Sequence, residues 1–457
     1  MKHSLSEKLA KFIQNFDSIK LPQEVYFETK KRIIDTVGCA ISAKHLCNTL
    51  SLEYTIEKIF SKGDSTLIGK EEKGSAMSAA LYNAFLAHSL ELDDSLPAVG
   101  HIGAVIIPVA FAVGEETRST GEELIRSIVL GYEIFSRIGN YSLRGHLQNR
   151  GFHPTGINGV FGATATASYL RRLNSEKITN ALGLAGGFSS GLLEAVNDGS
   201  SSKRLNPGMA AMNGIMATYL AENGFSGPRT ILEGRLGFYN AYVGTAKESD
   251  EILKSLGKEF LITRSKFKPF ASCKIIHPAI DTILSMLDGH DFQVQDINDI
   301  TVHMQHNGMP LVASLDKKHP TNQVQAQFSI YYMVAYTLIH KRPPLLDSIS
   351  ESSYHEHEVL EMADKVQVIE DSELEPKGDN SDLNRRCIID IRFKNGTKIS
   401  KTSKDDFDSM SIGDVLEKFH SITSGALSPE ESKEFLDKML NIEKSKNLGK
   451  ILELNFS

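Results

Sequence analysis

Apolar residues recur at intervals of three and four over most of the first 240 positions. The pattern is clear in YFETKKRIIDTVGCAIS at 26–42 and EELIRSIVLGYEIFSRI at 122–138, and it is the period of an amphipathic helix. Three further stretches are rich in small residues, which let helices approach closely, but polar residues interrupt them too often for a membrane span: 75–90, 159–170 and 208–221. The sequence therefore predicts a helical first half with buried central helices.

The pattern changes between about residues 265 and 400. β-Branched runs at 298–304 and 386–400 predict strands, and Asn395-Gly396 within the second run is a strong hairpin signal. We therefore expect a mixed α+β region here.

Helical spacing returns at 411–423 and 428–455, where Ser428 before Pro429 has the features of an N-cap. The acidic stretch 370–382 is expected to form an exposed loop. The predicted fold is mainly α, with two domains. A large all-helical domain spans 1–265 and is completed by 405–457, and a smaller α+β domain spans 266–404.

Length and composition agree with this division. A chain of 457 residues exceeds what one core usually organises, and 41% hydrophobic with 23% charged residues is an ordinary globular balance. The net charge of −7 comes without an extended basic stripe, so we predict no nucleic-acid partner. Local lysines, arginines and histidines still allow an anionic substrate.

Several other classes gain no support from the sequence. The charged N-terminus lacks the apolar core of a signal peptide, and no segment offers about 20 uncharged apolar residues; we expect a cytoplasmic protein without membrane contact. The four cysteines form no CxxC pair, and neither a phosphate-binding loop nor a dinucleotide fingerprint occurs. We predict neither a cofactor nor a metal ion.

The first candidate site is HSLELDDSLPAVGHIGAVIIP at 88–108, which crowds three carboxylates and two histidines. Asp93 and Asp94 could cap the loop by accepting backbone N–H groups. The carboxylates with His101 could also bind a metal, although no tight ligand motif such as HExxH is present. A third reading is acid/base chemistry, since an imidazole titrates near neutral pH. Spacing alone leaves these alternatives open.

Two further candidate sites precede small-residue helices. In RGFHPTGINGVFGA at 150–163, Thr155 or Asn158 could cap a helix whose N-terminus would receive a carboxylate beside His153; the alternative is an ordinary loop histidine. In NDGSSSKRLNPGMAAMNG at 197–214, Lys203 and Arg204 suit a substrate carboxylate, or form a solvated pair.

The fourth candidate site is SKFKPFASCKIIHPAIDTIL at 265–284. It places Lys268, Cys273 and His277 close together in the chain. A cysteine near cations could be an activated thiolate, although an isolated cysteine is more often inert.

Taken together, these stretches resemble the MmgE/PrpD family, which includes 2-methylcitrate dehydratases, cis-aconitate decarboxylases and an iminodisuccinate epimerase. The similarity covers nearly the whole chain, in the following order: IIDTVGCAI, NAFLAHSLELDD, GHIGAVIIPVAFA, GFHPTG, SKRLNPG, KPFASCKIIHPAID and AQFSIYYMVA. It implies a pocket between a large helical domain and an α+β lid domain, no cofactor, and a homodimer.

The resemblance also implies the pocket residues. His101 matches the histidine of the family's HP(G/S) step, His153 that of GFHPTG, and Lys203 the lysine of KRLxPG. Lys268 matches the lysine of KPY/KPF and Tyr332 the tyrosine of FSxxY. These five are the implied catalytic residues. The implied substrate-binding residues are Glu91, Asp94, Ser95, Arg204, Cys273 and His277.

The chain departs from the family at three of these positions. Glu91 stands where the decarboxylases have Asp, Cys273 where they have His, and Ser95 where many members have Thr. The dehydratases typically read NDTW where this chain has DDSL at 93–96. These departures affect the prediction of the substrate. They do not change the type of chemistry that the resemblance implies.

The resemblance implies a lyase that transfers a proton at a carbon next to a carboxylate. Lys203, Lys268 and Arg204 would hold the carboxylates of a small di- or tricarboxylate, and His101 and His153 would act as acid and base. Tyr332 and Ser95 would orient the substrate. We expect a 2-methylcitrate dehydratase-like hydro-lyase, with cis-aconitate decarboxylation or diacid epimerisation as alternatives, and a catalytically silent carboxylate-binding protein as the non-enzymatic alternative.

Overall fold

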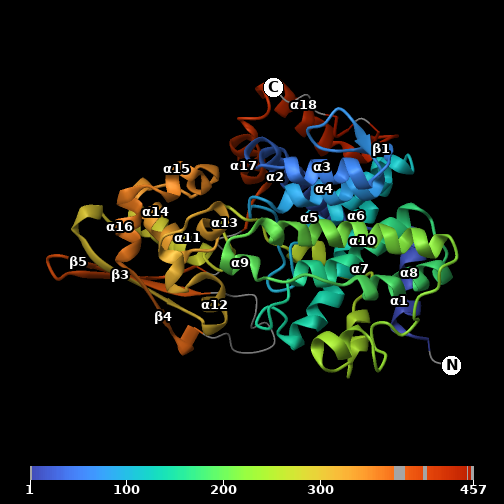
Figure 1. Cartoon of the computed structure of the whole chain (residues 1–457), viewed down its shortest axis with the longest axis horizontal. Coiled ribbons are helices and arrows are strands. Elements are labelled where there is room, and N and C mark those ends of the chain that lie inside the picture. The colour runs from blue at the N-terminus through green and yellow to red at the C-terminus, as the bar shows by residue number, and fades with distance from the viewer. Residues whose placement is uncertain (1–2, 375–385, 405–408, 450, 454–457) are drawn as a thin grey trace.

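The computed structural model describes residues 3–374, 386–404, 409–449 and 451–453. It is elongated, with a large helical body at one end of the long axis and a smaller α+β part at the other (Figure 1). The predicted fold class, mainly α with a smaller α+β part, is confirmed. Most of the predicted acidic loop and the predicted domain boundary at 404–405 fall on residues 375–385 and 405–408, which lie outside the described residues.

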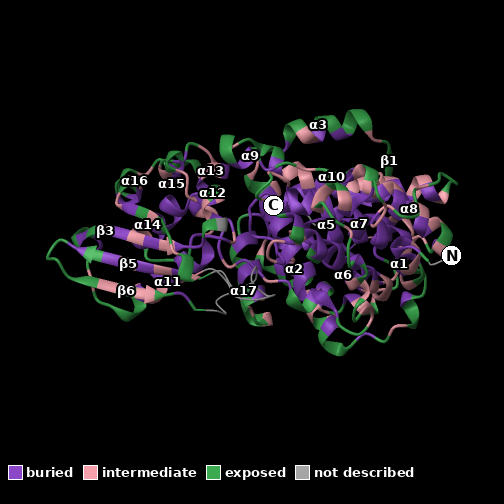
Figure 2. Cartoon of the chain, turned by 90° about the horizontal axis from the view of Figure 1, so that it is seen from below, coloured by how far each residue is buried: buried purple, intermediate pink, exposed green. Residues whose placement is uncertain are grey.

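The helical body contains the central small-residue helices that the sequence predicts, surrounded by longer amphipathic helices. Its helices from the first half of the chain are α1 (Leu5–Gln14), α2 (Gln23–Leu46), α3 (Leu50–Ile59), α4 (Ala76–His88), α5 (Gly103–Glu116), α6 (Gly121–Ser142), α7 (Pro154–Leu170), α8 (Ser175–Phe188), α9 (Ala195–Asp198) and α10 (Leu205–Glu222). A short antiparallel hairpin, β1 (Lys62–Thr66) with β2 (Lys73–Gly74), precedes α4. Buried residues are concentrated in the helices at the centre of this body (Figure 2).

Small residues set how closely α7 and α10 pack. A Cβ added at Gly214 on α10 would meet the side chain of Ala163 and would lie 2.8 Å from the backbone nitrogen of Thr164 on α7. Two backbones in such contact leave no room for a methyl group, so the glycine is required by packing.

Replacing Gly214 with Ala is therefore expected to lower the free energy of unfolding by about 1–3 kcal/mol, because α7 and α10 must separate. Gly187 on α8 is the matched control, since a Cβ there meets no atom within 4 Å. Gly187→Ala should stabilise the protein by about 0.4–1 kcal/mol, because alanine lowers the conformational entropy of the unfolded chain. Urea unfolding of both variants tests this; equal effects at the two positions would contradict the packing argument.

The α+β part is a four-stranded mixed sheet covered by helices. Its strands are β3 (Ile297–Met304), β4 (Val366–Glu370), β5 (Cys387–Phe393) and β6 (Lys398–Thr402), in the order β4-β3-β5-β6. Only β3 and β4 are parallel among these neighbours. The helices are α11 (His277–Gly289), α12 (Met309–Val312), α13 (Gln323–Gln327), α14 (Ile330–His340), α15 (Glu351–Tyr354) and α16 (His357–Asp364).

The predicted hairpin is confirmed between β5 and β6. Gly396 has a φ of +85°, a conformation that glycine adopts without strain. The side chain of Asn395 accepts hydrogen bonds from the backbone and hydroxyl of Thr397 at 2.9 and 2.7 Å. Along β5, buried residues alternate with more exposed ones, so one face of the sheet packs on α11 and α14.

The C-terminal helices α17 (Ile412–Thr423) and α18 (Pro429–Leu440) lie against α2 in the helical body (Figure 1). Ser428 caps α18 as predicted, within a capping box completed by Glu431. Lys418 on α17 is buried, and its Nζ donates to Asp35 on α2 at 2.5 Å and to the backbone carbonyl of Leu92 at 2.6 Å. The end of the chain therefore anchors the loop that follows α4.

Within the part of the chain that the structure describes, every helix falls short of the length and apolarity needed to cross a membrane. The cytoplasmic location and the homodimer stay predictions.

Candidate active site

Seven polar side chains from five segments meet where the helical body faces the α+β part. They are His88, Glu91, Asp93, His101, His153, Lys203 and Lys268, which we call the His–Lys cluster. His88 ends α4, and Glu91, Asp93 and His101 lie in the loop 89–102 before α5. His153 is the N-cap residue of α7, Lys203 lies in a 3-10 helix (Ser201–Arg204), and Lys268 precedes α11.

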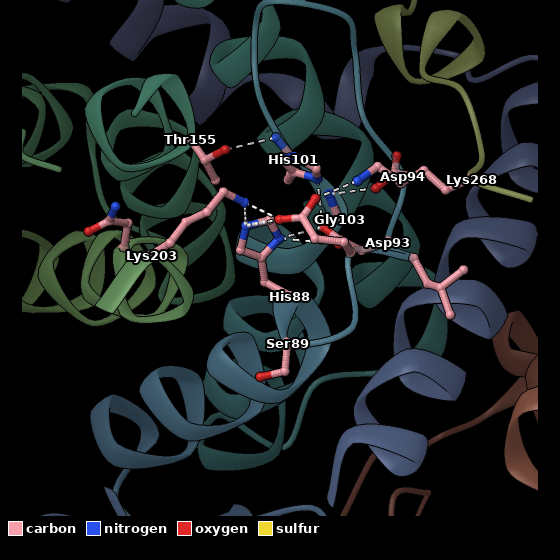
Figure 3. Close-up of polar contacts among 12 residues, drawn as sticks. His88, Ser89, Asp93, Asp94, His101, Gly103, Thr155, Lys203 and Lys268 are labelled. Carbon is pink, nitrogen blue, oxygen red and sulfur yellow. Dashed lines mark hydrogen bonds and ion pairs between the residues drawn. The ribbon is translucent and has the colours of Figure 1, made fainter. Parts of the chain in front are cut away.

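Asp93 lies between two imidazoles. Its carboxylate is 3.1 Å from Nδ1 of His88 and 3.0 Å from Nδ1 of His101 (Figure 3). Because an ionised carboxylate only accepts hydrogen bonds, the hydrogen bond between His88 and Asp93 places the proton of the His88 ring on Nδ1. The contact of Asp93 with His101 has the distance of an ion pair but lacks hydrogen-bond geometry, so it does not fix the tautomer of His101.

Glu91 lies between the two lysines. Its carboxylate forms an ion pair with Nζ of Lys203 and another, at 2.7 Å, with Nζ of Lys268. Nζ of Lys203 also lies 2.7 Å from Nε2 of His88, so the ammonium donates to this nitrogen. The Lys203 ammonium additionally lies over the ring of Phe328, 5.1 Å from its centroid. Both ammonium groups therefore converge on one buried carboxylate.

A hydrogen bond from Asn206 fixes the tautomer of His153. The side-chain amide nitrogen of Asn206 lies 3.0 Å from Nδ1 of His153 and also donates to the carbonyl of Leu192 at 3.1 Å. An amide nitrogen is a donor, so Nδ1 accepts and the ring proton sits on Nε2. The centroids of His153 and His101 lie 6.4 Å apart, so the N–H at Nε2 of His153 and the ring of His101 lie within one site.

The loop that carries Glu91 is held in a defined conformation. Glu91 has a φ of +54°, which is unfavourable for a residue with a side chain. Asp94 holds the start of α5 by accepting from the backbone of Gly103 at 2.9 Å, and it also accepts from Tyr132 and Ser265. The prediction that one of the two aspartates caps this loop is therefore confirmed for Asp94.

Burial and neighbouring charges divide the cluster into ionised and neutral groups. Burial alone would raise the pKa of Glu91, but Lys203 and Lys268 hold it well below its usual range. Burial likewise opposes ionisation of Asp93, but His101 and His88 hold its pKa well below the usual range. Burial raises the pKa of Asp94.

The imidazoles respond in the other direction. Burial lowers the pKa of His101 to about 4, against the attraction of Asp93. Burial, with Lys203 nearby, holds the pKa of His153 well below its usual range. The two candidate catalytic histidines are therefore neutral near pH 7, while Lys268 stays charged because Glu91 raises its pKa against the effect of burial.

His101 should make folding stability depend on pH. Below about pH 6.5 the unfolded chain binds a proton at His101, whereas the folded protein does so only near pH 4, so acidification favours unfolding. Between pH 7 and 5 this costs about 2 kcal/mol. His101→Asn keeps a donor toward Asp93 but cannot titrate, so urea unfolding should show a pH dependence smaller by about that amount. An unchanged pH dependence would contradict the lowered pKa.

His88, Asp93 and His101 also have ligand-type atoms within 4.8 Å of one another, as a metal site requires. In this structure Nδ1 of His88 hydrogen-bonds to Asp93, and Nδ1 of His101 lies 3.0 Å from the same carboxylate; binding a metal through Nδ1 of His88 would require that ring to give up its proton. We therefore assign no metal here.

The remaining predicted residues lie around the cluster or away from it. Ser95 pairs through its backbone with Lys266, two residues before Lys268, and its buried hydroxyl has no hydrogen-bond partner among the described residues. Cys273 is buried, and a negative charge on its thiolate would raise the pKa of Lys268. Nε2 of His277 donates to the carbonyl of Ser272 at 3.1 Å.

Two predicted residues contact other parts of the protein. The Tyr332 hydroxyl donates to the carbonyl of Ser348 at 2.7 Å, and its ring packs beside Tyr336. Tyr332 thus packs within the α+β part, and its role in orienting a substrate stays a prediction. The guanidinium of Arg204 lies 4.0 Å from the sulfur of Cys47, at the end of α2, instead of joining the cluster.

The predicted caps of α7 are wrong. The helix begins at Pro154 without a side-chain cap. Thr155 instead accepts from the backbone of His101 at 3.0 Å, and Asn158 donates to the carbonyl of Val99 at 3.2 Å. Both side chains therefore hold the 89–102 loop against α7, because those backbone groups have no partner in their own loop.

Sequence reasoning missed three residues of the site. His88 and Asp93 stand in the first candidate stretch, but periodicity gave no reason to prefer them over Asp94. Asn206 follows Lys203 by three positions, within SKRLNPG. Asn206 could have been found because it lies within the SKRLNPG motif that already contained Lys203. Neither its residue type nor its spacing predicts that its partner is a histidine 53 positions away.

Comparisons with known proteins cover nearly the whole chain. The MmgE/PrpD N-terminal domain matches residues 7–250, and the MmgE/PrpD C-terminal domain matches residues 270–444. A cis-aconitate decarboxylase from Aspergillus terreus is 24% identical over 483 aligned positions, covering 99% of this chain and 96% of that protein. The cis-aconitate decarboxylase from Homo sapiens is 25% identical, covering 97% of this chain and 92% of that protein.

Proposed function

Because this chain belongs to the MmgE/PrpD family, we propose that it is a lyase that moves a proton at carbon beside a carboxylate of a small di- or tricarboxylate, most closely a decarboxylase. The observation that carries the proposal is the His–Lys cluster. It combines two ammonium groups with one imidazole that offers a proton and one that offers a lone pair, all in a buried site.

Lys203 and Lys268 are the groups that would hold the substrate. An ammonium in a buried site interacts with a carboxylate far more strongly than in water. The same two charges would stabilise the negative charge that develops on the substrate during the reaction, without reorganisation of solvent. This is the largest contribution that the cluster can make to catalysis.

The two histidines supply the proton chemistry. In a decarboxylation the bond between the carboxylate and its carbon breaks, CO2 leaves, and the electron pair that remains takes up one proton. The N–H at Nε2 of His153 is the donor that Asn206 fixes, and solvent restores it afterwards. The neutral ring of His101, beside Asp93, is the acceptor that would remove a proton where the substrate must first be isomerised.

Decarboxylation replaces dehydration as our preferred reaction. Proteins named cis-aconitate decarboxylase align with this chain from end to end, and the chain lacks the NDTW sequence that the resemblance associates with the dehydratases. The exact substrate is a matter for assay, because identities of 24–25% leave room for a change of substrate within one chemistry.

NMR of the purified protein in D2O tests the proposal, with cis-aconitate, 2-methylcitrate and an aspartate-like diacid supplied separately. Loss of CO2 with one deuterium at carbon is expected from an unsaturated acid. Formation of an alkene from 2-methylcitrate would replace the proposal with dehydration, and deuterium exchange without a new product would replace it with epimerisation. No change with any acid would favour a catalytically silent carboxylate-binding protein.

Cofactor independence is a separate prediction. Both candidate histidines already have protein neighbours: Asn206 hydrogen-bonds to His153, and the Asp93 carboxylate lies 3.0 Å from His101. Dialysis against EDTA is therefore expected to leave kcat unchanged, measured on the substrate identified above. A loss of activity that Zn2+ restores would instead assign His88, Asp93 and His101 to a metal ion.

A further inference from the structure

His88 lies at the centre of the His–Lys cluster, and protein groups engage both of its ring nitrogens. Nδ1 lies 3.1 Å from an oxygen of Asp93, and Nε2 lies 2.7 Å from Nζ of Lys203 (Figure 3). The side chain is fully buried at the end of α4. Because both ring nitrogens are occupied within the protein, His88 can act on a substrate only through its neighbours.

The two contacts of His88 require one tautomer of the ring. A neutral imidazole has one N–H donor and one acceptor. The carboxylate of Asp93 is ionised and only accepts, whereas the ammonium of Lys203 only donates. The ring proton therefore belongs on Nδ1, and the lone pair of Nε2 points at Lys203. Asp93 thus orients the ring, and the ring in turn receives a hydrogen bond from the lysine.

The N–H groups of Lys203 show what this hydrogen bond achieves. An ammonium has three N–H groups on a flexible four-carbon stem. Among the described residues, Nε2 of His88 and Oε1 of Glu91 accept from Nζ, so one N–H is left for a ligand. Since the three N–H groups of an ammonium are arranged tetrahedrally, two fixed acceptors also fix the direction of the third.

We propose that His88 is a positioning residue for Lys203, and that it aims the remaining N–H of the ammonium at a substrate carboxylate. The inference rests on the proposed function, since it concerns one of the cations that would hold the substrate. With Glu91 as its sole acceptor, the ammonium would rotate about a single contact. Binding a substrate would then cost the entropy of ordering that group.

NMR of protein labelled with 15N in its histidines tests the geometry without a ligand. At pH 7 the His88 ring should be neutral, with its proton on Nδ1. The signal is identified by its absence from His88→Asn or His88→Gln. A ring protonated on Nε2, or on both nitrogens, would overturn the inference, because Lys203 would then have no acceptor in His88.

Two substitutions of His88 separate its two contacts. Asn places an amide near the position of Nδ1 and keeps a donor for Asp93, but it leaves no acceptor for Lys203. Gln places an amide oxygen near the position of Nε2 and keeps that acceptor, but it loses the donor. The ligands are glutarate and propane-1,2,3-tricarboxylate, which are saturated and therefore have no double bond to react.

Calorimetry with these two acids should distinguish the variants. His88→Asn is expected to weaken binding about tenfold, the usual effect of losing one hydrogen bond to a charged group. His88→Gln should stay within about threefold of the wild-type affinity, because the bond to Lys203 is kept. In a Lys203→Met background, His88→Asn should change the affinity less than about twofold, because the group that it positions is absent.

Equal losses in His88→Asn and His88→Gln would overturn the inference, as would a tenfold loss that persists in the Lys203→Met background, because the role of His88 would then be structural. If His88→Asn does not fold, the ring tautomer decides. A wild-type protein that binds neither acid would overturn carboxylate binding in the proposed function and this inference with it. The expected pattern of affinities without CO2 release from any unsaturated acid would remove decarboxylation and leave the role of His88 in place.

Discussion

Replacing His153 with Asn is expected to lower kcat on the carboxylate substrate about 100- to 10,000-fold, which is the usual contribution of a general acid. The substitution keeps an acceptor for Asn206 near the position of Nδ1 but removes the N–H at Nε2. Since the burial of the site is unchanged, KM should change little. Steady-state kinetics with the substrate found by NMR measures both constants.

His420→Asn is the matched control for this variant. His420 lies on α17 and bonds to Ser432 at 2.8 Å, outside the His–Lys cluster. It should retain full activity. Thermal unfolding must show that both variants are folded. A folded His153→Asn protein with wild-type kcat would exclude His153 as the proton donor.

Replacing Lys268 with Met is expected to lower kcat/KM about 100- to 1,000-fold, the usual effect of removing one electrostatic donor from an active site. Lys268 is fully buried, so water does not take over the stabilisation that its charge provides. Glu91 keeps its other partner, Lys203, and the protein should still fold. Steady-state kinetics measures the loss.

Lys317 provides the control for removing a buried lysine. It is 1% exposed and donates to the carbonyl of Leu311 at 2.5 Å within the α+β part. Lys317→Met should lower stability but leave kcat/KM within about twofold of the wild-type value, as expected for a residue outside the transition-state contacts. If both variants lost activity equally, the effect of Lys268 would be structural.

Periodicity was sufficient to predict the fold class. The buried central helices α4, α7 and α10 follow from runs of small residues, because few other side chains fit where helices pack so closely. The hairpin at Asn395-Gly396 follows from local turn chemistry alone. These features depend on interactions within a few residues or on the amount of apolar surface, both of which a sequence shows directly.

The chemistry of the candidate site was only partly predictable. Motifs indicated His101, His153, Lys203 and Lys268, and the structure brings these four together. The tautomer of His153 depends on Asn206 and that of His88 on Asp93, because the choice of ring nitrogen is set by contacts made elsewhere in the fold.

The wrong prediction that Thr155 caps α7 has the same physical origin, and so does the packing of Tyr332 within the α+β part. Tyr332 and Thr155 can each make hydrogen bonds with a substrate, with a helix end or with a distant carbonyl or amide. Their positions in the sequence do not distinguish these partners. In the folded protein, the carbonyl of Ser348 lies within hydrogen-bond distance of Tyr332, and the backbone N–H of His101 lies within hydrogen-bond distance of Thr155.

The bond between Lys418 and Asp35 joins positions 383 residues apart, and this separation has a consequence for how the protein matures. A ribosome adds about 5–20 residues per second, so roughly 20–80 s pass between synthesis of the two partners. From the synthesis of Leu92 until that of Lys418, 326 residues later, the carbonyl of Leu92 lacks its lysine donor, although α2 and α4 have already been made. A nascent chain therefore carries every histidine of the cluster long before the loop that bears His101 is anchored, and the cluster is complete only when the last helices have been made.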